Sequence, residues 1–363
     1  MEQYHSDITK LDVKPKIRES NFELLRIIAM LMVLVLHADF QAIGAPTRVD
    51  ILTSPITSAV KVLFEMASIV AVNVFVLISG WFGIRPSVKG FAKFVFQCLF
   101  FSVGIYSVML ALGKVNLSVR SIADCFFLVP NGYYWFIQSY IALYLISPVL
   151  NAFIKTSDKK DMCYVLLAFY TFQTLYSFLG NSAGFIAYGY SAFSFMGLYL
   201  LAAFVKRHLD YSSCNKEFYI AGYIGISILM TIVWLGATLM DLPSIFNRIS
   251  HYTNPLVIVS SVLLLLFFSK LKIYNGFINT VAASSFSVYL LHQNSHCVNY
   301  YIKSIKSVTP GQSYVELLCI IGIVMCWFIA AILIDQIRII LWDMYSTFAS
   351  KMRRLYGNSE RIR

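Results

Sequence analysis

Long apolar segments alternate with short polar segments along nearly the whole chain. Most of the apolar segments reach or approach the ~20 residues that a helix needs to cross a bilayer. The pattern therefore predicts an all-α, polytopic membrane protein with ten transmembrane helices. A span as short as 191–205 can be tilted or broken. The ten predicted spans are 22–40, 56–82, 91–112, 134–154, 162–179, 191–205, 218–240, 255–269, 277–302 and 314–342.

Composition agrees with this class of protein. Hydrophobic residues make up 58% of the chain and charged residues only 13%, whereas a soluble domain carries about 25% charged residues. If all ten segments span the membrane, 20 of the 29 Lys and Arg residues fall on the side of the N-terminus, six on the other side and three inside spans. The positive-inside rule then predicts that both termini are cytoplasmic.

The net charge of +11 is therefore explained by topology. The basic residues are spread over short loops and tails and form no basic helix interleaved with aromatic residues, so nucleic-acid binding is excluded. We expect a polar cytoplasmic tail over residues 1–20, a transmembrane domain over 21–343 and a basic cytoplasmic tail over 344–363. The basic cluster at 351–354 is expected to contact anionic lipid headgroups.

Several kinds of site chemistry find no support in the sequence. It contains no Walker or GxGxxG loop, no HExxH motif and no GxSxG motif. The seven cysteines form no CxxC pair and no cluster with histidine, so neither a metal site nor a disulfide framework is expected. No tightly bound cofactor is predicted.

The first span carries a cation and an imidazole on one helix face. Arg26 and His37 are eleven residues apart, which places them within about 20° of the same direction and about 16 Å apart along the axis. Taken singly, a membrane histidine often packs between helices, and an arginine near a helix end often extends to the headgroups or pairs with a residue such as Glu23. Together on one face, they indicate a functional site.

Two groups of residues near the cytoplasmic end of the second span are candidates for ligand binding. Ser79 and Gly80 permit the close approach either of a neighbouring helix or of a ligand. Arg85, Lys89 and Lys93 follow, and they form either a solvated loop or a phosphate-binding cluster.

Polar and aromatic residues also occur inside the second and fourth spans. Asn73 is costly in lipid and is expected to face the interior of the bundle. Trp135, Gln138 and Tyr140 open the fourth span and form either an interfacial aromatic belt or a sugar site. Sugar binding suits them because aromatic faces stack on the apolar side of a sugar while polar tips bond its hydroxyls.

The ninth span contains a dense polar patch with His292, Gln293 and Asn294. His292 either supports His37 or packs between helices, and the sequence leaves both readings open.

These stretches resemble the membrane acyltransferase-3 family, the ten-helix bacterial enzymes that O-acetylate capsule, lipopolysaccharide and other surface glycans. The run Glu23-Leu-Leu-Arg26, followed by His37, resembles the family's signature of arginine, ten residues and histidine. Further blocks at 74–82, 134–148 and 287–292 agree in order and spacing. One departure is Gln293, because many members carry an acidic residue just after the ninth-helix histidine.

The resemblance implies an acyltransferase of the bacterial cytoplasmic membrane. Its donor is expected to be acetyl-CoA or another short acyl-CoA from the cytoplasm, and its acceptor a surface or lipid-linked glycan. The expected catalytic residues are His37 and Arg26. The expected acyl-CoA site comprises Arg26, Ser79, Gly80, Arg85, Lys89 and Lys93. The expected acceptor site comprises Asn73, Trp135, Gln138, Tyr140, His292 and Asn294.

Two mechanisms and one rival function stay open at this point. His37 either takes a proton from the attacking hydroxyl or is itself acylated and passes the group on. Some family members carry a fused extracellular hydrolase-like domain, which this sequence lacks, so the chain is expected to complete transfer itself or with a partner. The rival is a transporter or flippase of lipid-linked sugars, for which paired broken helices would be expected. The sequence does not indicate an oligomeric state.

Overall fold

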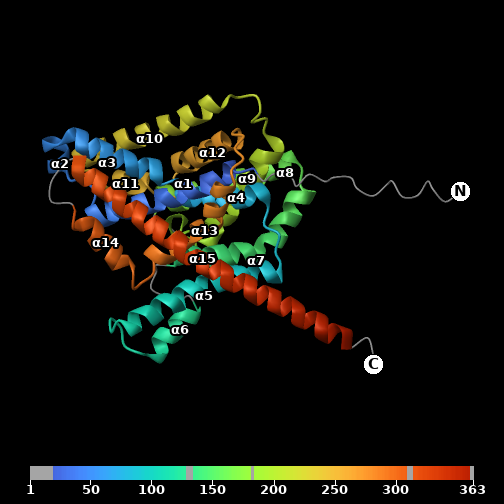
Figure 1. Ribbon diagram of the computed structural model, residues 1–363. Helices are drawn as coiled ribbons and strands as arrows, with labels where there is room; N and C mark the ends of the chain where they lie inside the picture. Colours follow the sequence, from blue (N-terminus) through green and yellow to red (C-terminus); the bar gives the residue numbers. More distant parts are fainter. Residues whose placement is uncertain (1–18, 128–133, 181–183, 309–313, 360–363) are drawn as a thin grey trace.

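The computed structural model describes residues 19–127, 134–180, 184–308 and 314–359, so the predicted tail at 1–20 lies almost wholly outside the described residues. In these ranges the chain is helical and forms no strand (Figure 1). The helices are α1 (Asn21–Leu36), η1 (His37–Ile43), α2 (Arg48–Thr53), α3 (Pro55–Ser68), α4 (Ala71–Phe82), α5 (Val88–Ala111), α6 (Val119–Phe127), α7 (Trp135–Thr156), α8 (Lys159–Gln173), η2 (Thr174–Leu179), η3 (Ala187–Gly189), α9 (Ala192–His208), α10 (Lys216–Leu239), α11 (Pro243–Ile249), α12 (Pro255–Ser269), α13 (Gly276–His292), α14 (Val298–Lys306) and α15 (Tyr314–Ser359).

The described residues include seven helical segments that are long and apolar enough to cross a membrane. They are α1 with η1, α3 with α4, α5, α7, α8 with η2, α10 and α15. Three further predicted spans coincide with α9, α12 and α13, which have only 15 to 17 residues. A helix of 17 residues is about 25 Å long, less than the roughly 30 Å of the hydrocarbon core. The count of ten spans and their orientation therefore stay predictions, while the all-helical, membrane-spanning class is confirmed.

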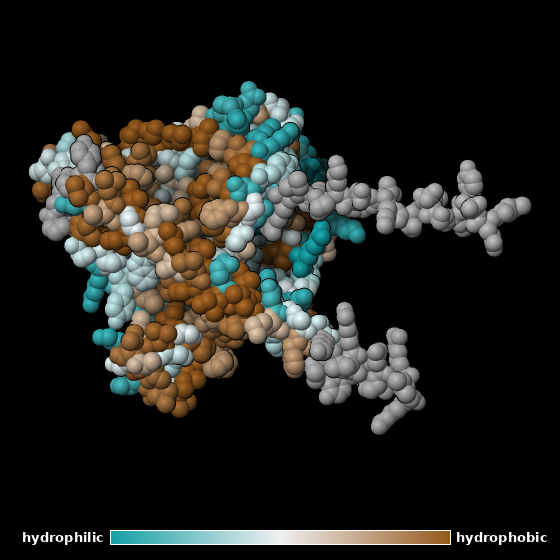
Figure 2. Space-filling model, in the orientation of Figure 1, coloured by the Kyte–Doolittle hydropathy of each residue, from teal (hydrophilic) through white to brown (hydrophobic). Residues whose placement is uncertain are grey.

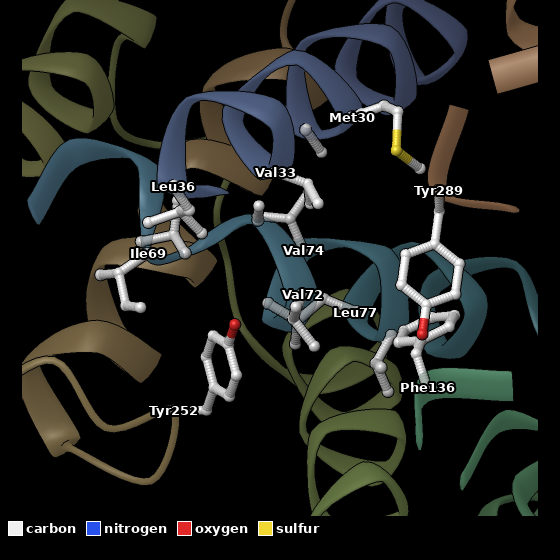
Figure 3. Packing of buried hydrophobic residues seen from close by; sticks show 14 of the residues in the cluster. Met30, Val33, Leu36, Ile69, Val72, Val74, Leu77, Phe136, Tyr252 and Tyr289 are labelled. Atoms are coloured by element: carbon white, nitrogen blue, oxygen red, sulfur yellow. The ribbon is translucent and has the colours of Figure 1, made fainter. Parts of the chain in front are cut away.

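Helices α9, α12 and α13 lie in the middle of the bundle. Helix α1 packs against α13, α4 and α12, and α4 packs against α9. The longer α5, α7, α10 and α15 expose many apolar side chains. The face of the molecule in Figure 2 is accordingly largely apolar. Met30 and Val33 from α1 meet Leu77 of α4, Phe136 of α7 and Tyr289 of α13 in the core (Figure 3).

The start of α1 and the last turns of α15 lie at the same end of the bundle, at the right of Figure 1. The opposite end holds η1 and the short helices α2, α11 and α14. This arrangement agrees with an even number of crossings. Helix α15 continues without a break to Ser359, so the segment expected as a tail from residue 344 begins as a helix.

Two predicted spans are interrupted. The second is one helix in the prediction, but the structure has a turn at Ile69 and Val70 between α3 and α4. Helix α4 passes through Gly80 without a break. The ninth predicted span, 277–302, ends as α13 at His292 and resumes as the separate α14 at Val298. This prediction of one continuous helix was wrong, because the polar residues between the two helices turn the chain.

Candidate active site

His37 lies where α1 changes from an α-helix to the π-helical turn η1. Such single turns of π-helix are rare and are frequent at functional sites. The turn ends at Gly44, whose positive φ of 95° suits glycine. His37 as a whole residue is partly exposed. Helix α1 thus places His37 at its far end, next to the end of α13.

The imidazole of His37 contacts the end of α13. His37 Nδ1 lies 2.8 Å from His292 Nε2 and 2.9 Å from the side-chain amide of Gln293. His292 is fully buried, and its Nδ1 bonds the backbone carbonyl of Val288 one turn earlier. Residues 255 positions apart in the chain therefore form one hydrogen-bonded cluster. We call His37, His292 and Gln293 the histidine cluster.

These contacts determine where the protons lie. A carbonyl oxygen only accepts, so His292 Nδ1 must carry a proton for its bond to Val288. Neutral His292 then offers a lone pair at Nε2, and His37 Nδ1 has to donate to it. The structure has Gln293 Nε2 at this contact, but two donors cannot face each other, so we assign the amide with its oxygen toward His37, because amide oxygen and nitrogen are assigned from hydrogen bonding. The lone pair of neutral His37 is therefore on Nε2, where it can accept a proton.

The end of α13 is held in place from several sides. The ring of Tyr301 packs on His292 with centroids 5.6 Å apart, and its hydroxyl donates to the Leu34 carbonyl at 2.7 Å. Asn294 donates to the Tyr134 hydroxyl at 2.8 Å, and that hydroxyl donates to the backbone carbonyl of Leu290, also in α13. Packing against Tyr301 and the hydrogen bonds of the neighbouring residues thus hold the side chains of the histidine cluster in position.

Arg26 lies at the other end of the predicted stripe. Met30 and Val33 between the two residues are buried, whereas the Arg26 side chain keeps 29% of its surface exposed. Its guanidinium forms an ion pair with Glu23 at 2.6 Å, the local pairing that the sequence left open. One end of α1 therefore offers a partly exposed cation and the other end an imidazole.

The structure assigns Gly80 to helix packing. A Cβ at this position would lie 2.3 Å from the Tyr199 carbonyl oxygen, so only glycine lets α4 and α9 approach this closely. Of the two readings of Gly80, close approach of a helix is the one observed. Ser79 Oγ donates to the Phe75 carbonyl and lies 3.3 Å from the Tyr140 hydroxyl.

The loop after α4 is ordered by tyrosines. The Tyr199 hydroxyl accepts from the Ile84 amide at 2.7 Å, and Tyr144 accepts from the Ser87 amide at 2.9 Å. This region contains the basic residues Arg85, Lys89 and Lys93. All three are exposed, at the end of the bundle where α1 begins.

The expected acceptor residues have different surroundings, and the acceptor site stays a prediction. Asn73 is buried and donates to the Tyr252 carbonyl at 3.0 Å, while Trp135 packs against Tyr190 with ring centroids 4.4 Å apart. Tyr140 lies instead beside Ser79, and Gln138 is exposed. His292 and Asn294 support His37 and Tyr134 as described above.

Sequence reasoning missed Asp39. This residue follows His37 by two positions, is 6% exposed, and its Oδ1 has no hydrogen-bond partner among the described residues. Glu65, which the sequence analysis did not single out as a site residue, is equally buried and lies within electrostatic range of Asp39. The sequence did carry a signal for Asp39, because a carboxylate inside the first apolar run is unusual. Within the described ranges no three His, Cys, Asp or Glu side chains are placed to hold a metal ion.

Comparison with known proteins supplies the family. Neither the curated proteins nor the solved structures contain a match to this chain. The family described as an acyltransferase domain matches residues 19–334, which include α1, the histidine cluster and most of the bundle. The chain belongs to the acyltransferase-3 family.

Proposed function

We propose that this protein transfers an acetyl or other short acyl group from acyl-CoA to a hydroxyl of a cell-surface or lipid-linked glycan. The observation that carries the proposal is the contact of 2.8 Å between His37 and His292. It leaves a lone pair on His37 Nε2, at a partly exposed position inside an acyltransferase domain. A general base needs a free lone pair that the acceptor hydroxyl can reach.

In the mechanism we favour, His37 Nε2 takes the proton of the acceptor hydroxyl as its oxygen attacks the thioester carbonyl. The tetrahedral intermediate then collapses, the carbon–sulfur bond breaks, and the imidazolium returns the proton to the leaving thiolate of CoA. His292 stays neutral throughout and keeps His37 in the reactive tautomer. Transfer through an acyl-His37 intermediate uses the same Nε2 and becomes the better route if donor and acceptor cannot meet.

The donor side of the proposal rests on charge. Arg85, Lys89 and Lys93 are exposed cations at the end of the bundle where α1 begins, and they suit the phosphates of CoA. Arg26 lies further along α1, about 16 Å from His37 by helix rise. We infer that the acyl arm passes Arg26, with Glu23 neutralising the guanidinium when the donor is absent.

The acceptor side follows from the position of His37 at the opposite end of the bundle. We infer that this end faces outward from a bacterial cytoplasmic membrane, as the distribution of lysine and arginine predicts. The aromatic cluster around Trp135 and Tyr190 is the surface we propose for sugar stacking.

The test is the variant His37→Gln, expressed in cells from which the native gene has been deleted. Mass spectrometry of surface glycans should show the loss of one acyl group per acetylated sugar, with transfer lowered by about two to four orders of magnitude. His208→Gln at the end of α9 is the matched control and should retain activity. Normal acylation by the His37→Gln protein would exclude His37 as the base.

The role of Arg26 needs a second measurement, because the residue is also ion-paired. Arg26→Lys keeps the charge but loses the planar donor fork. We expect weaker acetyl-CoA binding by calorimetry on detergent-purified protein, with little change in melting temperature. A lower melting temperature with unchanged affinity would make Arg26 a structural residue.

A further inference from the structure

A cavity of about 290 Å³ opens beside the end of α13. This is many times the roughly 10–15 Å³ that a single water needs, so the cavity has room for a charged group such as a phosphate. Its walls come from the end of α5, the turn after it, and the chain from the α13–α14 connection into α14. The lining residues are Met109, Lys114, Val115, Ser295, His296, Asn299, Tyr300 and Lys303.

The lining is positively charged. It contains Lys114 and Lys303 and no acidic residue. In the described part of the chain, neither lysine has a carboxylate within ion-pair distance. The other polar side chains in the lining supply hydrogen-bonding groups at the same surface. An unneutralised pair of ammonium groups facing one cavity suits an anion.

The helix that lines the cavity adds to this field. Helix α14 begins at Val298, and its N-cap residue Cys297 provides no side-chain cap. The positive end of the helix dipole is therefore at the same wall as Ser295 and His296. In the predicted topology only six Lys and Arg residues lie at this end of the bundle, and Lys114 and Lys303 are two of them.

The cavity is physically connected to the histidine cluster. His296, which lines the cavity, donates its backbone amide to Asn294 Oδ1 at 3.0 Å, two residues after His292. Helix α14 buries Tyr301 against His292 and turns Tyr300 and Lys303 toward the cavity. An anion held there is thus fixed relative to His37 by a short, well-bonded segment.

We propose that this cavity binds a phosphate group of the acceptor and so selects lipid-linked glycans that carry their charge near the reacting sugar. The inference rests on the proposed function, because it assigns the anion to the acyl acceptor. Phosphate groups also occur in phospholipid headgroups, and the experiment separates these two sources.

Binding is measured without acyl transfer, so that failure of this proposal and failure of the proposed function are distinguishable. The probes are geranylgeranyl monophosphate, the uncharged geranylgeraniol and phosphatidylglycerol, each titrated into detergent-purified protein. We expect the monophosphate to bind at least tenfold more tightly than either of the others. The His37→Gln protein should bind it normally, whatever that variant does to acyl transfer.

The double variant Lys114→Gln/Lys303→Gln should lose about tenfold or more in affinity for the monophosphate, because two charge-assisted hydrogen bonds disappear. Lys306→Gln is the matched control, since it lies on the same helix but outside the lining. Equal affinity of the double variant and the native protein would overturn the site. Equally tight binding of phosphatidylglycerol would overturn its assignment to the acceptor.

Discussion

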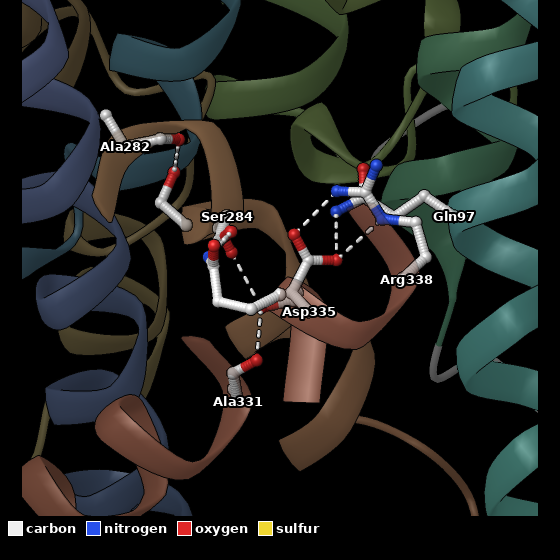
Figure 4. A network of polar contacts seen from close by, with 9 residues as sticks. Gln97, Ala282, Ser284, Ala331, Asp335 and Arg338 are labelled. Carbon is white, nitrogen blue, oxygen red and sulfur yellow. Dashed lines mark hydrogen bonds and ion pairs between the residues drawn. The ribbon is translucent and has the colours of Figure 1, made fainter. Parts of the chain in front are cut away.

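Helix α15 contains a buried ion pair that is also bonded from α5, and removal of this pair should have a large and asymmetric effect. Arg338 Nε donates to Asp335 Oδ1 at 2.9 Å and its Nη2 donates to Oδ2 at 2.6 Å, while Gln97 of α5 donates to the same carboxylate at 3.1 Å (Figure 4). The two charged side chains are only 2% and 0% exposed. The pair therefore has almost no contact with solvent that could replace a lost partner.

Asp335→Asn removes the negative charge and keeps the shape. It leaves a buried guanidinium that cannot release its proton, and breaking such a pair costs about 3–5 kcal/mol. Arg338 Nη1 already has no partner in the described residues, so no spare hydrogen bond offsets the loss. Arg338→Met should cost less, because the remaining carboxyl can take up a proton and Gln97 still bonds to it.

The double variant Asp335→Leu/Arg338→Met should be close to the native protein in stability, since buried pairs replaced by apolar residues are often neutral or stabilising. Melting in detergent, followed by tryptophan fluorescence, compares the three variants with the native protein. The single Asp335→Asn change should lower the melting temperature by on the order of 10 °C. Equal losses in Asp335→Asn and the double variant would refute the reasoning, because the two charges would then be uncoupled.

Three further predictions address packing, the histidine cluster and topology. Gly80→Val should lower stability by about 1–3 kcal/mol or more by forcing α4 from α9, and an unchanged melting temperature would contradict that packing. His292→Ala should slow acyl transfer roughly tenfold to hundredfold with unchanged acetyl-CoA affinity, because His37 loses the partner that sets its tautomer; a native rate would show that His292 only packs. In a cysteine-free background, cysteine labelling at Lys159 should succeed only from the cytoplasm and at Lys306 only from outside, and the reverse pattern would invert the orientation.

The positions of the long helices were predictable from the sequence, because membrane helices are specified by long apolar runs. Predicted span 255–269 coincides with α12, and the other spans mostly differ by a few residues at their ends. The turn at Ile69 and Val70 was not predictable, since both residues are apolar and β-branched and neither glycine nor proline marks the place. The break after His292 was indicated by the polar residues that follow it. The mean hydropathy of the whole predicted span conceals this short polar run.

The candidate site was predictable in its chemistry and less so in its geometry. The spacing of Arg26 and His37 follows from helix rise and turn alone, and α1 is regular between them. The contact of His37 with His292 is a tertiary event between two helices distant in the sequence, so the sequence left two readings of His292 open. Gln138 is exposed although it was expected in the acceptor site, because the order of polar residues does not reveal which side of α7 packs inward.

Gln293 departs from the acidic residue expected at its position, and the structure gives a reason why a neutral side chain serves there. Hydroxyl, thioester, ester and thiol are all uncharged, so the proposed reaction begins and ends without net charge. A carboxylate beside His37 would stabilise the imidazolium and reduce the fraction of free base before the acceptor arrives. In the proposed mechanism His37 has His292 and the amide of Gln293 as neutral partners, and it acquires a positive charge only while the proton is in transit. The departure at Gln293 is therefore consistent with direct transfer by a neutral base.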